Sequence, residues 1–192
     1  MTNTEFAVEA LPIAGAYLIQ PATFGDHRGY FSVAHDRNQL LKHGIDADFF
    51  QDNQSFSAAP NTLRGLHCQM PPYEQAKLVR VLQGRATDVI VDARRGSPTF
   101  GAHHKQDLSA DNRLQVFIPR GCLHGFVTRE PDTIVMYKVD NEYSQGNDRS
   151  VLWNDPALGI DWELGDAEPV LSQKDLSALS WDAFDTPFRY GE

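Results

Sequence analysis

The sequence predicts an all-β fold, a sandwich or barrel of the jelly-roll type. Short apolar runs recur along most of the chain, and clusters of Gly, Pro, Asn and Asp separate them at short intervals. Helical patterns are confined to two short segments, so strands must supply the core. The 192 residues suit a single domain, 1–192, that is large enough to bury such a core.

The first strands are expected near the N-terminus. Residues 16–19 and 30–33 are short apolar runs, and turn-forming residues that include Gly25 and Arg28-Gly29 lie between them. We therefore expect two strands joined by a turn.

A helix of about two turns is predicted at residues 36–43. Asp36 can cap its start and Gly44 lies just past its end. Residues 51–53, which follow, can present polar side chains on a strand edge, but their composition favours an exposed polar loop.

The β signal is densest in the middle of the chain. Residues 78–82 and 86–93 flank a Gln83-Gly84 turn and predict a hairpin, with Thr87, Val89 and Val91 on one face of its second strand. Further strands are expected at residues 100–108, 114–118, 125–128, 133–139 and 150–153.

The final segment, residues 154–192, has a different composition. It is rich in turn formers and aromatic residues, which predicts a segment that wraps over the sheets. Within it, Ser172 can cap a short helix that runs through residue 179.

The composition is that of a soluble globular protein, with 41% hydrophobic and 22% charged residues. No apolar run is long enough to cross a bilayer, and the N-terminus lacks the basic start of a signal peptide, so we expect a cytoplasmic protein and no membrane partner. Cys68 and Cys122 are expected to be free thiols. A net charge of −9 disfavours nucleic acid, whereas a small anionic ligand needs only local cations such as Arg64 and Lys77.

Candidate chemical groups concentrate in residues 61–77. Arg64, His67 and Lys77 lie there close to Pro71-Pro72, which predicts that they converge on a rigid bend. A second histidine, His124, ends a P-x-G-x-x-H segment at the start of a predicted strand. Histidines at corresponding ends of paired strands would face one cavity.

A metal site is the competing interpretation of these histidines. His67, Glu74 and His124 are possible ligands, but Gln69 stands where the second histidine of an H-x-H pair would be. The cations Arg64 and Lys77 nearby also disfavour a dication. We therefore expect no metal and no cofactor.

His67 with a carboxylate partner would instead be a general base near neutral pH. Spacing alone does not identify that partner. Tyr137 lies in an alternating strand pattern, where a tyrosine commonly fills the core, and Lys77 can extend its amine to solvent.

Taken together, the motifs resemble the dTDP-4-dehydrorhamnose 3,5-epimerase family, a metal-independent branch of the cupins. The resemblance covers nearly the whole chain, and the combination of RGLH with WNDPxLGIxW is highly specific. The matching segments are FGDHRGYF (24–31), QDNQS (51–55), LRGLHCQMPP (63–72), KLVRVLQG (77–84), VDARRGSPTFG (91–101), IPRGCLHGF (118–126), YK (137–138) and VLWNDPALGIDW (151–162).

This resemblance implies a cupin-type double-stranded β-helix and a nucleotide-linked 4-keto-6-deoxy sugar as substrate. It implies that His67 is the base, that Asp175 is its carboxylate partner and that Tyr137 is the acid on the opposite face. Lys77 would steady the enolate oxygen. Binding roles are implied for Arg28, Gln51, Asn53, Arg64, His124, Asp148 and Lys174. The family is dimeric, so a homodimer is expected in which Arg28 reaches the neighbouring subunit's site.

The chain departs from the family pattern at Val33 and Asp148, where a glutamate is usual, and at Glu142-Tyr143, where two tyrosines are usual. These positions lie toward the nucleotide. The resemblance implies conversion of dTDP-4-dehydro-6-deoxy-D-glucose to dTDP-4-dehydro-L-rhamnose. The alternatives are an epimerase that inverts one centre or uses a CDP- or GDP-sugar, and a non-catalytic or metal-dependent cupin that binds an anionic sugar.

Overall fold

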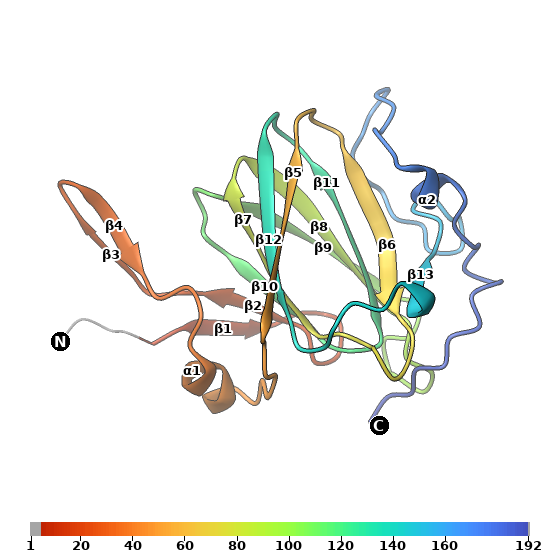
Figure 1. Ribbon diagram of the computed structural model, residues 1–192, viewed down its shortest axis with the longest axis horizontal. Helices are drawn as coiled ribbons and strands as arrows, with labels where there is room; N and C mark the ends of the chain where they lie inside the picture. The colour runs from red at the N-terminus through yellow and green to blue at the C-terminus, as the bar shows by residue number, and fades with distance from the viewer. Residues whose placement is uncertain (1–4, 192) are drawn as a thin grey trace.

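The structure, a computed structural model, describes residues 5–191. In this range two antiparallel sheets pack face to face and a small hairpin projects from the body (Figure 1). The all-β, jelly-roll prediction is confirmed. Residues 1–4, which begin the N-terminal stretch judged not to be a signal peptide, lie outside the described range. No helix between residues 5 and 191 is long and apolar enough to cross a membrane.

The larger sheet of the described chain has six strands, and every neighbouring pair in it is antiparallel. Its order is β1 (Ala7–Ala10), β2 (Tyr17–Gln20), β10 (Gln115–Ile118), β7 (Lys77–Gln83), β12 (Thr133–Val139) and β5 (Gln51–Ser57).

The second sheet has five strands within residues 5–191 and is also antiparallel. Its order is β13 (Asp148–Ser150), β6 (Leu63–Gln69), β11 (Cys122–Thr128), β8 (Arg85–Asp92) and β9 (His103–Ser109). The projecting hairpin is formed by β3 (Thr23–Asp26) and β4 (Gly29–Ser32).

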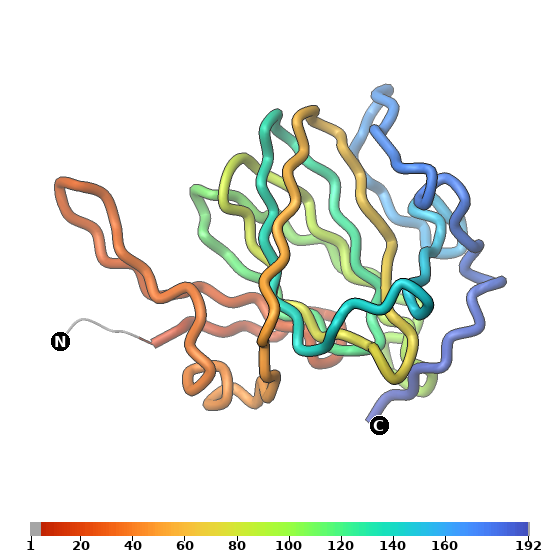
Figure 2. The backbone as a smooth tube through the Cα atoms, viewed as in Figure 1, coloured from red at the N-terminus to blue at the C-terminus, as the bar shows by residue number. Residues whose placement is uncertain are grey.

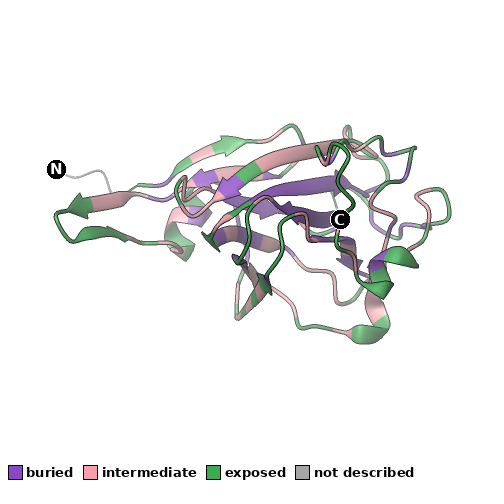
Figure 3. Cartoon of the chain, turned by 90° about the horizontal axis from the view of Figure 1, so that it is seen from above, coloured by how far each residue is buried: buried purple, intermediate pink, exposed green. Residues whose placement is uncertain are grey.

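The core between the sheets is apolar. Val79 and Val135 from the larger sheet belong to one buried cluster with Ile90 and Phe126 from the smaller sheet. Burying side chains of this size stabilises the fold by roughly 1.5–3 kcal/mol each. Figure 3 shows the central strands as the buried part of the molecule and the β3–β4 hairpin as largely exposed.

The C-terminal segment covers the outer face of the smaller sheet. Trp162 and Phe184 are buried there against Val89 and Val91 of β8. Because Val89 and Val91 point outward while Ile90 points inward, both faces of β8 are covered, which explains its nearly continuous apolar run. Figure 2 shows this segment running along the outside of the sheet to the C-terminus.

Two short α-helices occur in the described chain. Helix α1 (Arg37–Lys42) begins where predicted, and the Asp36 side chain accepts hydrogen bonds from two backbone N–H groups of its first turn. Helix α2 (Gln173–Leu176) is capped by Ser172 as predicted, but it ends before residue 179.

The predicted hairpin of residues 78–93 is wrong in its pairing. Both strands exist, but β7 belongs to the six-stranded sheet and β8 to the five-stranded sheet. The chain crosses between the sheets at Gly84, whose φ of 75° suits glycine. A tight glycine turn has the same local signal in a hairpin and in a corner between sheets.

Three other expectations are corrected. The runs at 16–19 and 30–33 are not partners, because β2 pairs with β1 and β10 whereas β4 pairs with β3. Residues 51–57 form strand β5 rather than a polar loop, since pairing with β12 satisfies their backbone groups. The strand expected at residues 150–153 lies earlier in the chain, because β13 spans Asp148–Ser150.

Candidate active site

A pocket of about 290 Å3 lies between the inner faces of the two sheets. A smaller hollow of about 200 Å3 adjoins it and shares His67, Lys77, Tyr137 and Lys174 with it. The larger space is lined by Ser55, Arg64, His67, Lys77, His124, Phe126, Tyr137, Ser172, Lys174 and Asp175. The smaller one adds Gln51, Asn53, Cys68, Gln69, Gln75, Tyr143 and Asp148.

The two histidines enter this pocket from neighbouring strands. His67 on β6 is the direct cross-strand partner of His124 on β11. Leu66 and Cys68, which flank His67, belong to the cluster on the outer face of the sheet, so the alternation of the strand turns His67 inward. The expectation that the histidines face one cavity is confirmed. His67 lies within a strand, however, and not on the bend that we predicted for residues 61–77.

His67 is joined to a carboxylate from the far end of the chain. Its Nε2 lies 2.7 Å from Oδ1 of Asp175, whose side chain is only 3% exposed. Since a carboxylate oxygen can only accept, Nε2 carries the proton and Nδ1 of the neutral ring is left as the acceptor.

The charges of this pair are set by burial and hydrogen bonding. Burial lowers the pKa of His67, and this effect outweighs the opposing hydrogen bond from Asp175. For Asp175 burial acts in the raising direction, but hydrogen bonds from His67 and Ser172 dominate and lower its pKa. The pair is therefore a neutral imidazole beside a carboxylate at neutral pH, which is the state that can take up a proton.

Gly65 allows the histidine strands to approach each other. Its φ is +132°, and a Cβ at this position would lie 2.5 Å from Cα of Gly125 and 2.9 Å from the carbonyl oxygen of His124. The ladder between β6 and β11 shifts register at this point. The N–H of Gly65 instead donates to Oδ1 of Asp175 at 3.3 Å. The backbone at Gly65 thus shapes the sheet and the dyad together.

Substituting Gly65 with alanine should destabilise the protein by about 2–5 kcal/mol, because the new methyl group meets backbone atoms that cannot rotate away and the positive φ is strained. Thermal and urea unfolding would measure this loss. Gly146→Ala is the matched control, since no atom lies within 4 Å of its added Cβ and its φ is not positive. Equal stability of the two variants would contradict the assignment.

Tyr137 and Lys77 enter the pocket from the opposite sheet. Tyr137 on β12 packs against the core between the sheets, and Nζ of Lys77 on β7 lies 5.9 Å from the centre of its ring. Burial raises the pKa of the Tyr137 hydroxyl, which keeps it protonated, and burial lowers the pKa of Lys77. A neutral imidazole on one sheet therefore faces a phenol hydroxyl and an amine on the other.

Further polar groups surround this centre. Asn53 on β5 is the cross-strand partner of Tyr137 and accepts a hydrogen bond from the Gln51 side chain at 2.8 Å. The guanidinium of Arg64 donates to the backbone carbonyl of Phe56 at 3.1 Å.

An ion pair borders the smaller hollow. Nζ of Lys174 lies 2.5 Å from Oδ2 of Asp148, and the Tyr143 hydroxyl donates to the same oxygen at 3.3 Å. The structure thus brings every expected catalytic and binding residue except Arg28 to these two adjoining hollows.

His124 also has a carboxylate partner. Its Nε2 lies 2.7 Å from Oδ2 of Asp88, and both side chains are buried. Asp88 was not among the site residues expected from the sequence. The available signal was its position in β8, where it alternates with the outward Thr87 and Val89 and so points into the sandwich.

Two residues expected near the site lie elsewhere. Arg28 is in the turn of the β3–β4 hairpin, pairs with Asp26 and does not line the pocket of its own chain. Glu74, a possible metal ligand, approaches Arg120 at 3.8 Å and lines a different hollow from the one that contains His67 and His124. Among residues 5–191 no group of three or more His, Cys, Asp or Glu side chains could hold a metal ion.

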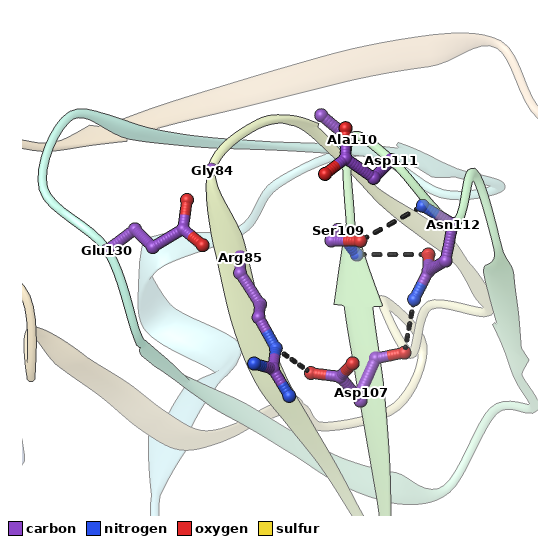
Figure 4. A pocket seen from close by; sticks show the side chains of 8 residues that line it. All are labelled: Gly84, Arg85, Asp107, Ser109, Ala110, Asp111, Asn112 and Glu130. Carbon is purple, nitrogen blue, oxygen red and sulfur yellow. Dashed lines mark hydrogen bonds and ion pairs between the residues drawn. The ribbon is translucent and has the colours of Figure 1, made fainter.

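A separate surface hollow of about 510 Å3 lies at the β8–β9 end of the molecule (Figure 4). Arg85 pairs with Asp107 across it at 2.7 Å. Ser109 and Asn112 exchange two hydrogen bonds that close the following turn. These two residue pairs are engaged with each other, which assigns them a structural role.

The chain matches the family described as dTDP-4-dehydrorhamnose 3,5-epimerase over residues 10–183. The protein of that name from Sinorhizobium fredii is 44% identical over 186 residues, which are 97% of this chain and 95% of the relative.

Two solved structures are also similar. The Legionella pneumophila dTDP-6-deoxy-D-glucose-3,5-epimerase in complex with dTDP-4-keto-L-rhamnose is 37% identical, with a TM-score of 0.92 over 98% of this chain and 100% of that one. A 3'-monoepimerase from Streptomyces bikiniensis in complex with dTDP-quinovose is 31% identical, with a TM-score of 0.84 over 91% and 88%. The chain belongs to the dTDP-4-dehydrorhamnose 3,5-epimerase family.

Proposed function

We propose that the protein epimerises C3 and C5 of dTDP-4-dehydro-6-deoxy-D-glucose and so forms dTDP-4-dehydro-L-rhamnose. The observation that carries this proposal is the arrangement of the pocket: the His67–Asp175 dyad lies on one sheet, and Tyr137 and Lys77 lie on the other. Inversion of a carbon centre requires a base and an acid on opposite faces of the sugar.

The C4 carbonyl of such a sugar acidifies the hydrogens on C3 and C5. Nδ1 of His67 takes a proton from one of these carbons, and the electron pair of the C–H bond passes to the C4 oxygen as an enolate. The amine of Lys77 stabilises this oxyanion in a site that is partly shielded from water. The Tyr137 hydroxyl returns a proton to the other face, and solvent restores both groups to their starting states.

Binding roles follow from charge and position. Arg64 and Lys174 line the pocket and would bind the substrate's diphosphate, since guanidinium and ammonium groups pair with phosphate oxygens. Lys174 would exchange its contact with Asp148 for that with phosphate. His124, Gln51 and Asn53 offer hydrogen bonds to the sugar and nucleotide.

We further propose a homodimer in which Arg28 completes the neighbouring subunit's site. The β3–β4 hairpin projects from the body (Figure 1). Its adjacent side chains Tyr30 and Phe31 are 59% and 65% exposed, and large exposed side chains side by side favour an interface with another chain. Arg28 itself lies outside the pocket of its own chain. A cytoplasmic location is part of this proposal, and the free, buried thiols Cys68 and Cys122 agree with a reducing compartment.

Mixing two inactive variants tests the shared site. Arg28→Ala and His67→Asn should each lower activity, while a 1:1 mixture that has been allowed to exchange subunits should regain activity in about a quarter of its sites. This follows because half of the dimers are then mixed, and one site of each mixed dimer has both residues. A mixture no more active than its components would exclude the shared site.

The substrate range tests the main proposal against its alternatives. The dTDP-, CDP- and GDP-linked 4-keto-6-deoxy sugars should be compared at equal concentration, with and without a chelator, and products identified by NMR. We expect turnover of the dTDP-sugar with inversion at both centres and no effect of chelation. Turnover only of another nucleotide, inversion of one centre, or activity lost on chelation would each identify the corresponding alternative.

A further inference from the structure

The carboxylate of Asp175 is held at both of its oxygens. Oδ1 accepts from Nε2 of His67 at 2.7 Å and from the Gly65 N–H at 3.3 Å. Oδ2 accepts from the Ser172 hydroxyl at 2.6 Å and from the Ser172 N–H at 3.4 Å. A carboxylate with a donor on each oxygen cannot rotate without breaking a hydrogen bond, so the donors on Oδ2 determine where Oδ1 points.

Ser172 has a second, purely structural task. It is the N-cap of α2, and its Oγ also accepts from the backbone N–H of Asp175 at 3.3 Å, which completes a capping box. Such boxes commonly only stabilise a helix end. Here the acidic member of the box is the same carboxylate that faces His67, and the helix is only four residues long. Ser172 also lines the pocket.

We propose that Ser172 is a positioning residue for the reaction: its hydroxyl holds Asp175 so that Oδ1 stays directed at His67 while the imidazole takes up and releases a proton. The inference rests on the proposed function in that it takes His67 as the base. Ser172 acts through Asp175 and not on the substrate, so its loss affects the chemical step more than binding.

The loss of the hydroxyl has two consequences for the dyad. The carboxylate keeps its hydrogen bonds from His67 and Gly65 but is oriented less narrowly, which lowers kcat. Its charge is also less dispersed by hydrogen bonds, so the protonated form of His67 becomes more stable relative to the neutral form. Since His67 acts in its neutral form, the activity lost at low pH should then be lost at a higher pH than in the unsubstituted protein.

The test compares Ser172→Ala with the unsubstituted protein. We expect kcat to fall about 10- to 100-fold, the range for one hydrogen bond to a charged group, with KM changed less than threefold. The acid limb of kcat/KM should move to higher pH. Ser172→Thr keeps the hydroxyl. Its kcat should lie within a few-fold of that of the unsubstituted protein, and the acid limb of its kcat/KM profile should lie at the original pH.

Asp36→Ala is the matched control for the capping effect. Asp36 caps α1, away from the pocket, so this variant should lose stability without a change in the pH profile. If Ser172→Ala folds too poorly to assay, the pair Ser172→Thr and Ser172→Val makes the same comparison with side chains of equal shape. Unchanged kcat and pH profile in the variants without a hydroxyl, or a change confined to KM, would overturn the proposal.

NMR titration of the His67 ring separates this proposal from the proposed function. If the unsubstituted protein does not epimerise the sugar, the proposed function fails, but the titration still reports on the dyad. The His67 pKa should be higher in Ser172→Ala than in the unsubstituted protein and unchanged in Asp36→Ala. An identical titration in all three proteins would show that Ser172 is a helix cap only.

Discussion

Substituting His67 with asparagine should lower the rate of proton exchange from the substrate by about 10²–10⁴-fold, the usual contribution of a general base. Asparagine is polar and smaller than histidine, but it has no basic nitrogen, so the variant removes the proton acceptor without adding a charge or an overly large side chain. Exchange followed by NMR in deuterated water gives the rate directly.

His43→Asn is the control for this substitution. His43 is an exposed residue at the end of α1, away from the pocket. It should leave both exchange and turnover at the level of the unsubstituted protein. Exchange in His67→Asn within a few-fold of that level would show that another group removes the proton.

Substituting Tyr137 with phenylalanine should separate exchange from inversion. The ring still packs beside Lys77, but the hydroxyl that delivers the proton to the opposite face is gone. Inversion should fall by about 10²–10⁴-fold, since a general acid contributes in this range. Exchange through His67 should fall much less, because the base can return a solvent deuteron to the face from which it removed the proton.

Parallel measurements of deuterium uptake and product formation check this separation. Tyr17→Phe, in β2 and outside the pocket, is the matched control and should change neither rate. Equal losses of exchange and inversion in Tyr137→Phe would place the hydroxyl in the proton-removing step. Inversion at the original rate would exclude it as the acid.

The strands of the fold could be predicted from sequence more easily than their partners. Residues 133–139 were predicted with the bounds that β12 has, because alternation along one strand is a local property. The neighbours of β7 and β8 depend on which sheet each strand joins, and the Gly84 turn carries no signal for that choice. The polar strand β5 was missed as a strand for the same reason, since only its partner β12 makes it regular.

The candidate site shows the same division. The motifs predicted that His67 and His124 face one cavity, but the strand alternation that turns His67 inward was not predicted, because residues 61–77 were expected to form a bend. The contact of His67 with Asp175 joins residues 108 positions apart, and no spacing rule predicts it, so it came only from the resemblance to a family. The proposed role of Ser172 could not be predicted from the sequence, because its local signal is that of an ordinary helix cap and its contact with Asp175 matters only through His67.

The proposed function requires that the His67 dyad and Tyr137 act on opposite faces of a 4-keto sugar at two carbons. Incubation of the protein with dTDP-4-dehydro-6-deoxy-D-glucose in deuterated water, followed by NMR of each sugar position, tests it most directly. We expect deuterium at both C3 and C5 together with inverted configuration at both. Absence of deuterium at both positions at high enzyme concentration would contradict the proposed function.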